Sequence, residues 1–133
     1  METNTYKEIL QQPAMWQIEY QKLVAEKAAI SAFLNQYLTS DTDVVLTGAG
    51  TSAFIGDALV PILRQGIFRN CRAVATTDLV THTAAFVQKD KPLLLISFAR
   101  SGNSPESVAT VNSINRYCTN VAHIFITCNE SGA

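Results

Sequence analysis

The sequence predicts an α/β fold, a three-layer α-β-α sandwich built on a parallel sheet. Short apolar segments rich in β-branched residues alternate with segments of helical periodicity along the 133 residues. The predicted strands are apolar on both faces, which is typical of strands covered by helices on both sides. Apolar residues make up 47% of the chain and charged residues 16%, which allows a core and excludes a disordered or highly charged chain.

The N-terminal segment, residues 1–38, is predicted to be helical. Residues 1–12 are polar and are expected to form an arm, and Pro13 suits a helix start. After it, apolar side chains recur at steps of three, four or seven residues, which places them on one helical face: Trp16, Tyr20, Leu23, Ile30, Phe33, Leu34 and Tyr37. This stripe predicts core or interface packing, along one helix or two, ahead of a domain over residues 39–133.

Four strands are predicted within this domain, over residues 43–47, 72–76, 92–97 and 123–127. The first connection is a helix over 53–65, which Gly66 ends and which Pro61 should bend or split. A short helix over 79–86, capped by Thr77-Asp78, and a longer helix over 104–118 form the other connections. The fourth strand is expected to leave an open apolar edge, which indicates a fragment, a truncated product or an obligate oligomer.

Charge and cysteine content narrow the classes of function. Ten Lys and Arg residues against eleven Asp and Glu residues give a net charge of −1, so nothing indicates nucleic acid or a membrane surface as a partner. No apolar run approaches a membrane span and no secretory signal is present, so the expected location is cytoplasmic. Cys71, Cys118 and Cys128 are expected to be buried thiols in a reducing compartment. His82 and His123 stand alone, so no metal site is expected.

Two loops that follow predicted strands carry the candidate binding residues, because ligands of open parallel sheets bind beyond the carboxyl ends of the strands. The first loop is Gly48-Ala-Gly-Thr-Ser52. Its glycines let the backbone approach a ligand closely, and its hydroxyls lie at a helix start that offers N–H groups. Gly50, Thr51 and Ser52 are therefore candidates for an anion or sugar site, although a tight turn with a Ser or Thr cap explains them equally well.

The second loop, Arg100-Ser-Gly-Asn-Ser-Pro-Glu-Ser107, is the stronger candidate for an anion site. A helix cap, a proline at the first helical position and an acid in the first turn explain Ser104-Pro-Glu106. Capping does not explain the three small hydrogen-bonding residues before the cap, and a phosphate requires such donors at a helix N-terminus. The candidate phosphate-binding residues of this loop are Arg100, Ser101, Gly102, Asn103 and Ser104.

A strand order of 2-1-3-4 would place the two loops on either side of one crevice, which suits a compact phosphorylated metabolite. One rival interpretation is a dinucleotide site, because Gly48-x-Gly50-x-x-Ala53 fits the dinucleotide fingerprint and Asp78 follows the second strand. Asp78 lies 28 residues beyond Gly50, somewhat far for the ribose-binding acid. An NAD-binding Rossmann domain is therefore the minor alternative.

With both loops in view, the chain resembles a sugar isomerase (SIS) domain. It is similar to one branch of that family, the tagatose-6-phosphate ketose/aldose isomerases, also described as galactosamine-6-phosphate deaminases. The resemblance spans almost the whole chain and rests on Leu46-Thr-Gly-Ala-Gly-Thr-Ser-Ala-Phe-Ile-Gly-Asp57, Thr76-Thr-Asp-Leu-Val80, Leu93-Leu-Leu-Ile-Ser-Phe-Ala-Arg-Ser-Gly-Asn-Ser-Pro-Glu-Ser107 and Ile126-Thr-Cys-Asn-Glu130. It implies a flavodoxin-like sheet of order 2-1-3-4-5, of which this chain would lack the last strand.

The resemblance also implies that the chain binds a phosphorylated sugar or amino sugar and needs no cofactor. Ser101 and Ser104, with nearby backbone amides, would hold the phosphate, and Thr51 and Ser52 would touch the phosphate or the sugar hydroxyls. Many members carry another serine at the position of Ala99, so this chain either lacks that hydroxyl contact or makes it through Ser97, two residues earlier on the same strand face. The implied activity is aldose–ketose isomerisation or amino-sugar-6-phosphate deamination.

Members of this branch carry two such domains, so a second SIS domain or a homo-oligomeric partner is expected. The Glu base and the His of catalysing relatives come largely from segments beyond this chain or from a partner subunit, so no catalytic residue is assigned. Glu106, Glu130 and Asp78 are the acids near strand ends, and each has a simpler structural explanation. The alternative function is a non-catalytic sugar-phosphate-binding or regulatory module.

Overall fold

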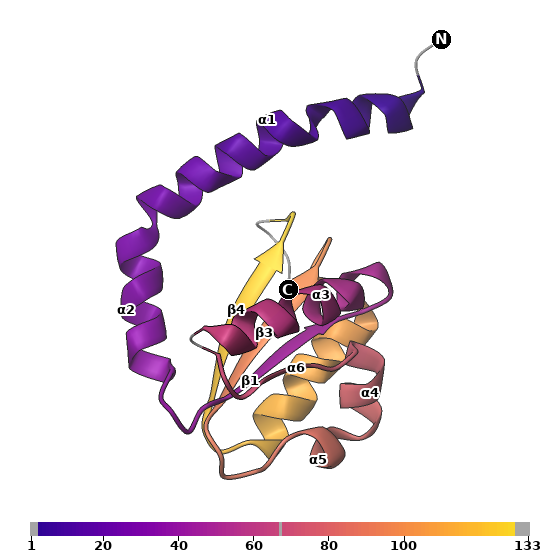
Figure 1. Cartoon of the computed structure of the whole chain (residues 1–133). Helices are drawn as coiled ribbons and strands as arrows, with labels where there is room; N and C mark the ends of the chain where they lie inside the picture. Colours follow the sequence, from indigo (N-terminus) through magenta and orange to yellow (C-terminus); the bar gives the residue numbers. More distant parts are fainter. Residues whose placement is uncertain (1–2, 67, 130–133) are drawn as a thin grey trace. The chain divides into compact units, whose positions relative to one another are not determined.

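The computed structural model describes residues 3–66 and 68–129, which fall into two units, Met1–Gln36 and Tyr37–Ala133 (Figure 1). The first unit contains α1 (Asn4–Ala25) and most of α2 (Lys27–Tyr37). Thr3 caps α1 by accepting a hydrogen bond from the Tyr6 N–H. The prediction of an arm over residues 1–12 is therefore wrong for residues 4–12, which belong to α1. Pro13 lies inside this helix rather than at its start. The segment before Pro13 forms a helix because most of its residues have good helical propensity.

Most of the apolar stripe of the N-terminal segment is exposed in this structure, and its residues Phe33 and Leu34 are half-buried. Neither α1 nor α2 contains a buried residue, and the Trp16 and Tyr20 side chains are 67% and 68% exposed. The described residues therefore do not show the stripe packed in a core. The alternative prediction, that the stripe forms an interface, stays a prediction. The break between the two helices lies at Glu26, whose N–H bonds to Lys22 O.

The second unit is built on a four-stranded sheet in the order β2-β1-β3-β4, and all its strand pairs are parallel. The strands are β1 (Asp43–Gly48), β2 (Cys71–Ala73), β3 (Leu93–Ala99) and β4 (Val121–Thr127). The predicted α/β class and strand order are confirmed. Every residue of β1 is buried, as expected for a central strand, whereas β4 is an edge strand with Phe125 53% and Ile126 51% exposed.

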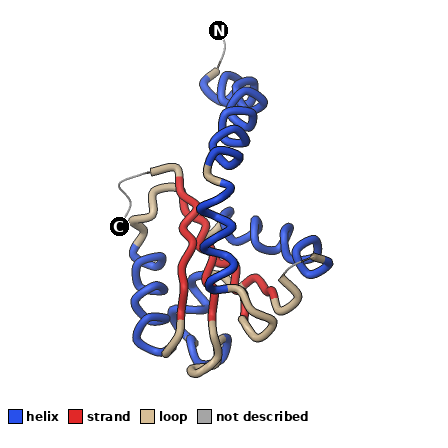
Figure 2. The backbone as a smooth tube through the Cα atoms, turned by 90° about the vertical axis from the view of Figure 1, so that its left-hand side faces the viewer, coloured by secondary structure: helices blue, strands red, loops and turns tan. Residues whose placement is uncertain are grey.

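Helices cover the two faces of the sheet, which makes the predicted three layers (Figure 2). On one face lies α3 (Thr51–Gln65), where a Cβ built on Gly56 would lie 3.2 Å from Leu46 Cβ. On the other face lie α4 (Thr76–Thr81), α5 (Thr83–Phe86) and α6 (Pro105–Tyr117). Val45 of β1, Leu95 of β3 and Ile114 of α6 belong to the core on this second face. The strand residues next to Val45 and Leu95 point to the opposite face, because side chains alternate along a strand.

The structure differs from the predicted elements between β1 and β3. The chain leaves the sheet after Ala73, and Thr76 already begins α4, so the second strand is shorter than predicted. The predicted helix over 79–86 is two helices that meet at His82, and α4 is capped by Ala75 without a side-chain hydrogen bond rather than by Thr77-Asp78. The remaining helix, α6, agrees with the prediction, with Ser104 as its cap.

Pro61 neither ends nor splits α3, which runs without a break from Thr51 to Gln65. A proline removes one N–H and leaves the carbonyl four residues earlier without its helical donor. That carbonyl belongs to Asp57, and both Asp57 and Pro61 are exposed. Solvent can therefore bond the carbonyl, which explains why the helix tolerates this proline.

The cysteines differ in exposure. Cys71 and Cys118 are buried free thiols, and burial raises the pKa of each. Cys128, just beyond β4, is exposed, so its predicted burial is wrong. The reason is its position at the carboxyl end of an edge strand, where the last three strand residues are also exposed.

Candidate functional site

The two predicted binding loops begin side by side at the carboxyl edge of the sheet. In the parallel register, Gly48 at the end of β1 pairs with Phe98 of β3. Ala99, the last residue of β3, pairs in turn with Thr127 of β4. The segments that follow β1, β3 and β4 therefore leave the sheet at the same level, with the β3 loop between the other two.

The first loop turns sharply into α3. A Cβ on Gly48 would lie 2.6 Å from the backbone carbon and oxygen of Ser52, so the helix folds closely over the end of the strand. Gly50 is the cap residue, with φ 55° and ψ −125°, and makes no side-chain bond. Thr51 and Ser52 lie in the first turn of α3. The cap explanation for these two hydroxyls is therefore wrong, and Thr51 is exposed at this edge.

Two serines of the second loop, Ser101 and Ser104, have different roles. Ser104 Oγ accepts a hydrogen bond from Ser107 N at 3.3 Å and donates one to Ser107 Oγ at 2.8 Å, which caps α6. Ser101 Oγ accepts a bond from Asn103 N at 3.3 Å, and Gly102 between them has φ 76°. The bond to Asn103 uses a lone pair of the Ser101 hydroxyl, so its proton can be donated to a ligand.

The end of β4 holds the second loop in place. The hydroxyl of Thr127 and the N–H of Cys128 both donate to Arg100 O at 3.2 Å. Asn129 Nδ2 donates to Ser101 O at 3.3 Å. The sequence reasoning gave these three residues no role. The polar side chains of Thr127, at the end of β4, and of Asn129, two residues later, are the signal that could have identified this segment.

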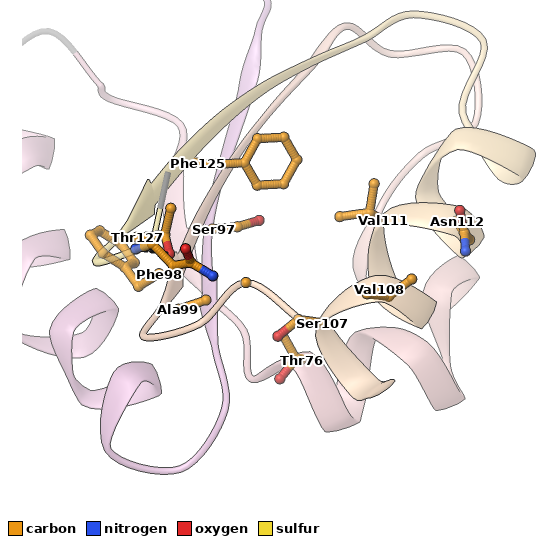
Figure 3. Close-up of a pocket in the computed structure, with 12 residues that line it drawn as sticks. Thr76, Ser97, Phe98, Ala99, Ser107, Val108, Val111, Asn112, Phe125 and Thr127 are labelled. Carbon is orange, nitrogen blue, oxygen red and sulfur yellow. Dashed lines mark hydrogen bonds between the residues drawn. The ribbon is translucent and has the colours of Figure 1, made fainter. Parts of the chain in front are cut away.

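A cavity of about 460 Å³ lies beside this loop, between α6 and the face of β3 and β4 (Figure 3). Apart from Gly102, the candidate residues do not line it. The Ser97 side chain points into the cavity from β3, and Thr76 lines it at the start of α4. Both hydroxyls are buried and lack a hydrogen-bond partner among the described residues. The cavity is mostly apolar and lies next to the predicted anion site rather than within it.

The titratable groups described near the sheet form no obvious catalytic set. His123 pairs with Leu95 in mid-strand, its Nε2 lies 2.8 Å from Asn115 Oδ1, and burial lowers its pKa. Asp78 and Glu106 lie in the first turns of α4 and α6, and Glu130 lies outside the described residues.

Over residues 3–66 and 68–129, no three His, Cys, Asp or Glu side chains gather as metal ligands would. No helix over these ranges is both long and apolar enough to cross a bilayer.

Comparison with known proteins connects this geometry with one family. The model of the SIS domain family matches residues 23–133. The chain is 47% identical over 132 residues to D-galactosamine-6-phosphate deaminase AgaS of Escherichia coli, a match that covers 98% of this chain and 34% of the relative. AgaS of a Shewanella species is 40% identical over 132 residues, with 96% and 34% covered. The chain thus spans about a third of the length of the curated relatives it matches.

Solved structures show the same fold. Tagatose-6-phosphate ketose/aldose isomerase from Escherichia coli superposes with a TM-score of 0.94 at 47% identity, over 98% of this chain and 36% of that chain. A phosphoheptose isomerase from Francisella tularensis gives a TM-score of 0.72 at 17% identity, over 99% and 78%. The second similarity concerns the fold alone.

Proposed function

The chain belongs to the SIS domain family, and from this premise we propose that its residues 39–133 form a phosphosugar-binding domain, with 1–38 as an N-terminal helical segment. The phosphate lies on the loop after β3, and the sugar lies toward the loop after β1. The ligand class is a sugar or amino-sugar 6-phosphate of the tagatose or galactosamine type, the substrates named for the relatives.

The observation that carries this proposal is the geometry of the β3 loop. Ser101 and Gly102 lie just before Ser104, the N-cap of α6, a 13-residue helix whose first N–H groups carry partial positive charge. Ser104 caps the helix, which leaves the Ser101 hydroxyl as the side-chain donor for a phosphate oxygen. Arg100 is exposed next to it and supplies a cation. Gly50, Thr51, Ser52 and Asn103 complete the proposed binding surface.

The proposed reaction is aldose–ketose isomerisation or deamination of the bound sugar phosphate. The phosphate does not react, so its binding energy orients the sugar carbons. A base moves a proton between C2 and C1 through an enediol, or through an enolamine when C2 carries nitrogen. Hydrolysis of the nitrogen-bearing intermediate then releases ammonia. No described residue of this chain is assigned as that base, so the complete site includes a second SIS domain or a partner subunit.

The test is a thermal-shift series with galactosamine 6-phosphate, tagatose 6-phosphate, the unphosphorylated sugars and NAD. A ligand at about 100 times its dissociation constant stabilises the folded state by about 2.7 kcal/mol, which raises the melting temperature of a chain of this size by about 10 °C. We expect this shift for the sugar phosphates, and we expect Ser101→Ala to reduce it while Ser113→Ala on the same helix does not. Stabilisation by NAD alone would support the dinucleotide alternative.

A turnover assay separates the two forms of the proposal. Release of ammonia from galactosamine 6-phosphate, or formation of the ketose, assigns an enzymatic function to this chain. Binding of the same compound without turnover assigns the non-catalytic binding or regulatory function.

A further inference from the structure

The loop proposed to bind phosphate is fastened to β4 through its carbonyl oxygens. Arg100 O accepts two hydrogen bonds, from the Thr127 hydroxyl and from the Cys128 N–H, each at 3.2 Å. Ser101 O accepts a third from Asn129 Nδ2 at 3.3 Å. Asn129 N in turn donates to Thr127 Oγ1 at 3.2 Å, which ties the two side chains to each other. Two consecutive peptide groups of the loop are therefore held from the same side.

The direction of these carbonyls fixes the direction of two N–H groups. A trans peptide is planar, and its C=O and N–H bonds point in opposite directions. The described chain has no cis peptide bond. When Arg100 O points toward β4, the N–H of Ser101 points away from it, and the bond from Asn129 to Ser101 O has the same effect on the N–H of Gly102.

The side of the loop opposite to β4 is the side that would face the phosphate. In the sheet, β3 lies between β4 and β1, so a group turned away from β4 is turned toward the loop after β1. That loop carries Thr51 and Ser52, the other half of the proposed site. The contacts from β4 thus turn the Ser101 and Gly102 N–H groups toward the loop after β1.

We propose that Thr127 and Asn129 are positioning residues, which orient the Ser101 and Gly102 amides of the β3 loop for a phosphate monoester without touching it. This inference rests on the proposed function, since it names the residues that prepare the same site. It assigns a role to the carboxyl end of β4 beyond pairing with β3. Gly102, with φ 76°, lets the chain turn into the α6 cap after the two oriented peptides.

The experiment compares Thr127→Val, Thr127→Ser and Asn129→Ala with the unmodified chain by calorimetric titration of galactosamine 6-phosphate. Valine keeps the shape of threonine but loses the donor, whereas serine keeps the donor. Because one hydrogen bond contributes a modest net amount, we expect Thr127→Val and Asn129→Ala each to raise Kd about five-fold. Thr127→Ser is expected to bind like the unmodified chain. The melting temperatures of the two Thr127 variants should change little, since Thr127 is exposed.

A matched control exists just before the amino end of β4, at the other end of the same strand. Thr119 is also exposed, and its hydroxyl also donates to a loop carbonyl, Lys89 O, at 3.2 Å. Thr119→Val therefore removes the same kind of bond far from the phosphate loop and should leave Kd unchanged. Equal Kd values for Thr127→Val and the unmodified chain would overturn the proposal. So would an equal loss of affinity in Thr127→Ser.

Amide NMR spectra keep this inference separate from the proposed function. Without any ligand, the Ser101 and Gly102 cross-peaks should move in Thr127→Val and stay in place in Thr127→Ser and Thr119→Val. If the unmodified chain binds no sugar phosphate, the proposed function is wrong, and unmoved cross-peaks in Thr127→Val would then show that the orienting contacts are wrong as well. If it binds and the cross-peaks stay in place, only the positioning role fails.

Discussion

Replacing Gly48 by alanine should force the first turn of α3 away from the end of β1. The new Cβ would lie 2.6 Å from the backbone carbon and oxygen of Ser52 and 2.9 Å from its Cβ, whereas ordinary contact begins at 3.4 Å. The difference between 3.4 and 2.6 Å requires a displacement of about 0.8 Å. The atoms in the way belong mainly to the backbone, so no rotamer change can relieve the overlap. Overpacking of this kind costs about 2–3 kcal/mol.

Urea denaturation of Gly48→Ala measures this cost. With a slope of about 1.5–2 kcal/mol per M for a domain of this size, the midpoint should fall by about 1–2 M while the slope stays the same. Gly66→Ala is the control, because a Cβ there meets nothing closer than Leu63 O at 3.8 Å. Its midpoint should change by less than about 0.5 M. A Gly48→Ala midpoint equal to that of the unmodified chain would show that α3 does not pack on the end of β1 as described.

Two further predictions concern parts of the fold that support the site. Burial alone would raise the pKa of Asp43, but hydrogen bonds from Lys91 at 2.6 Å and Arg72 at 3.1 Å outweigh it and lower the pKa. The carboxylate therefore stabilises the fold above its unfolded pKa of about 4, and this stabilisation is lost as pH falls through the lower pKa of the folded state. Asp43→Asn should consequently reduce the fall in the free energy of unfolding that is measured between pH 7 and pH 2. The buried Thr110 hydroxyl lies 3.1 Å from Thr76 O and 2.8 Å from Glu106 O, so its one proton is shared between a contact to the start of α4 and a contact within α6. Thr110→Val removes both contacts and should lower the free energy of unfolding by about 1 kcal/mol, and Thr110→Ser should lower it by less because serine keeps the hydroxyl. Equal free energies for the valine variant and the unmodified chain would contradict this role.

The parallel sheet could be predicted because its strands have distinctive local sequences. The segments around Val45 and Leu95 are apolar on both faces, and this pattern is typical of strands covered by helices on both sides. The second strand was harder to predict, because Val74 and Thr76 are β-branched but leave the sheet. Val74 N still bonds to Leu46 O, and the chain then turns into α4. Tertiary pairing with β1, rather than local propensity, sets the end of β2.

The binding loops could be predicted in part, because glycines, small polar residues and a helix cap have short-range signatures. The sequence identified Ser101 and Ser104 together, but only the structure separates their roles, since Ser104 is engaged with Ser107. The contribution of Thr127 and Asn129 could not be predicted from local patterns. It depends on contacts across 27 and 28 residues, which arise only when β3 and β4 pair.

The crystal structure of this chain with galactosamine 6-phosphate tests the central claim most directly. We expect the phosphate at the loop after β3, with its oxygens about 3 Å from the Ser101 hydroxyl and from the N–H groups of Ser101 and Gly102. The sugar should extend toward Thr51 and Ser52. A phosphate bound instead in the cavity beside Phe125, or at the opposite edge of the sheet, would contradict the account.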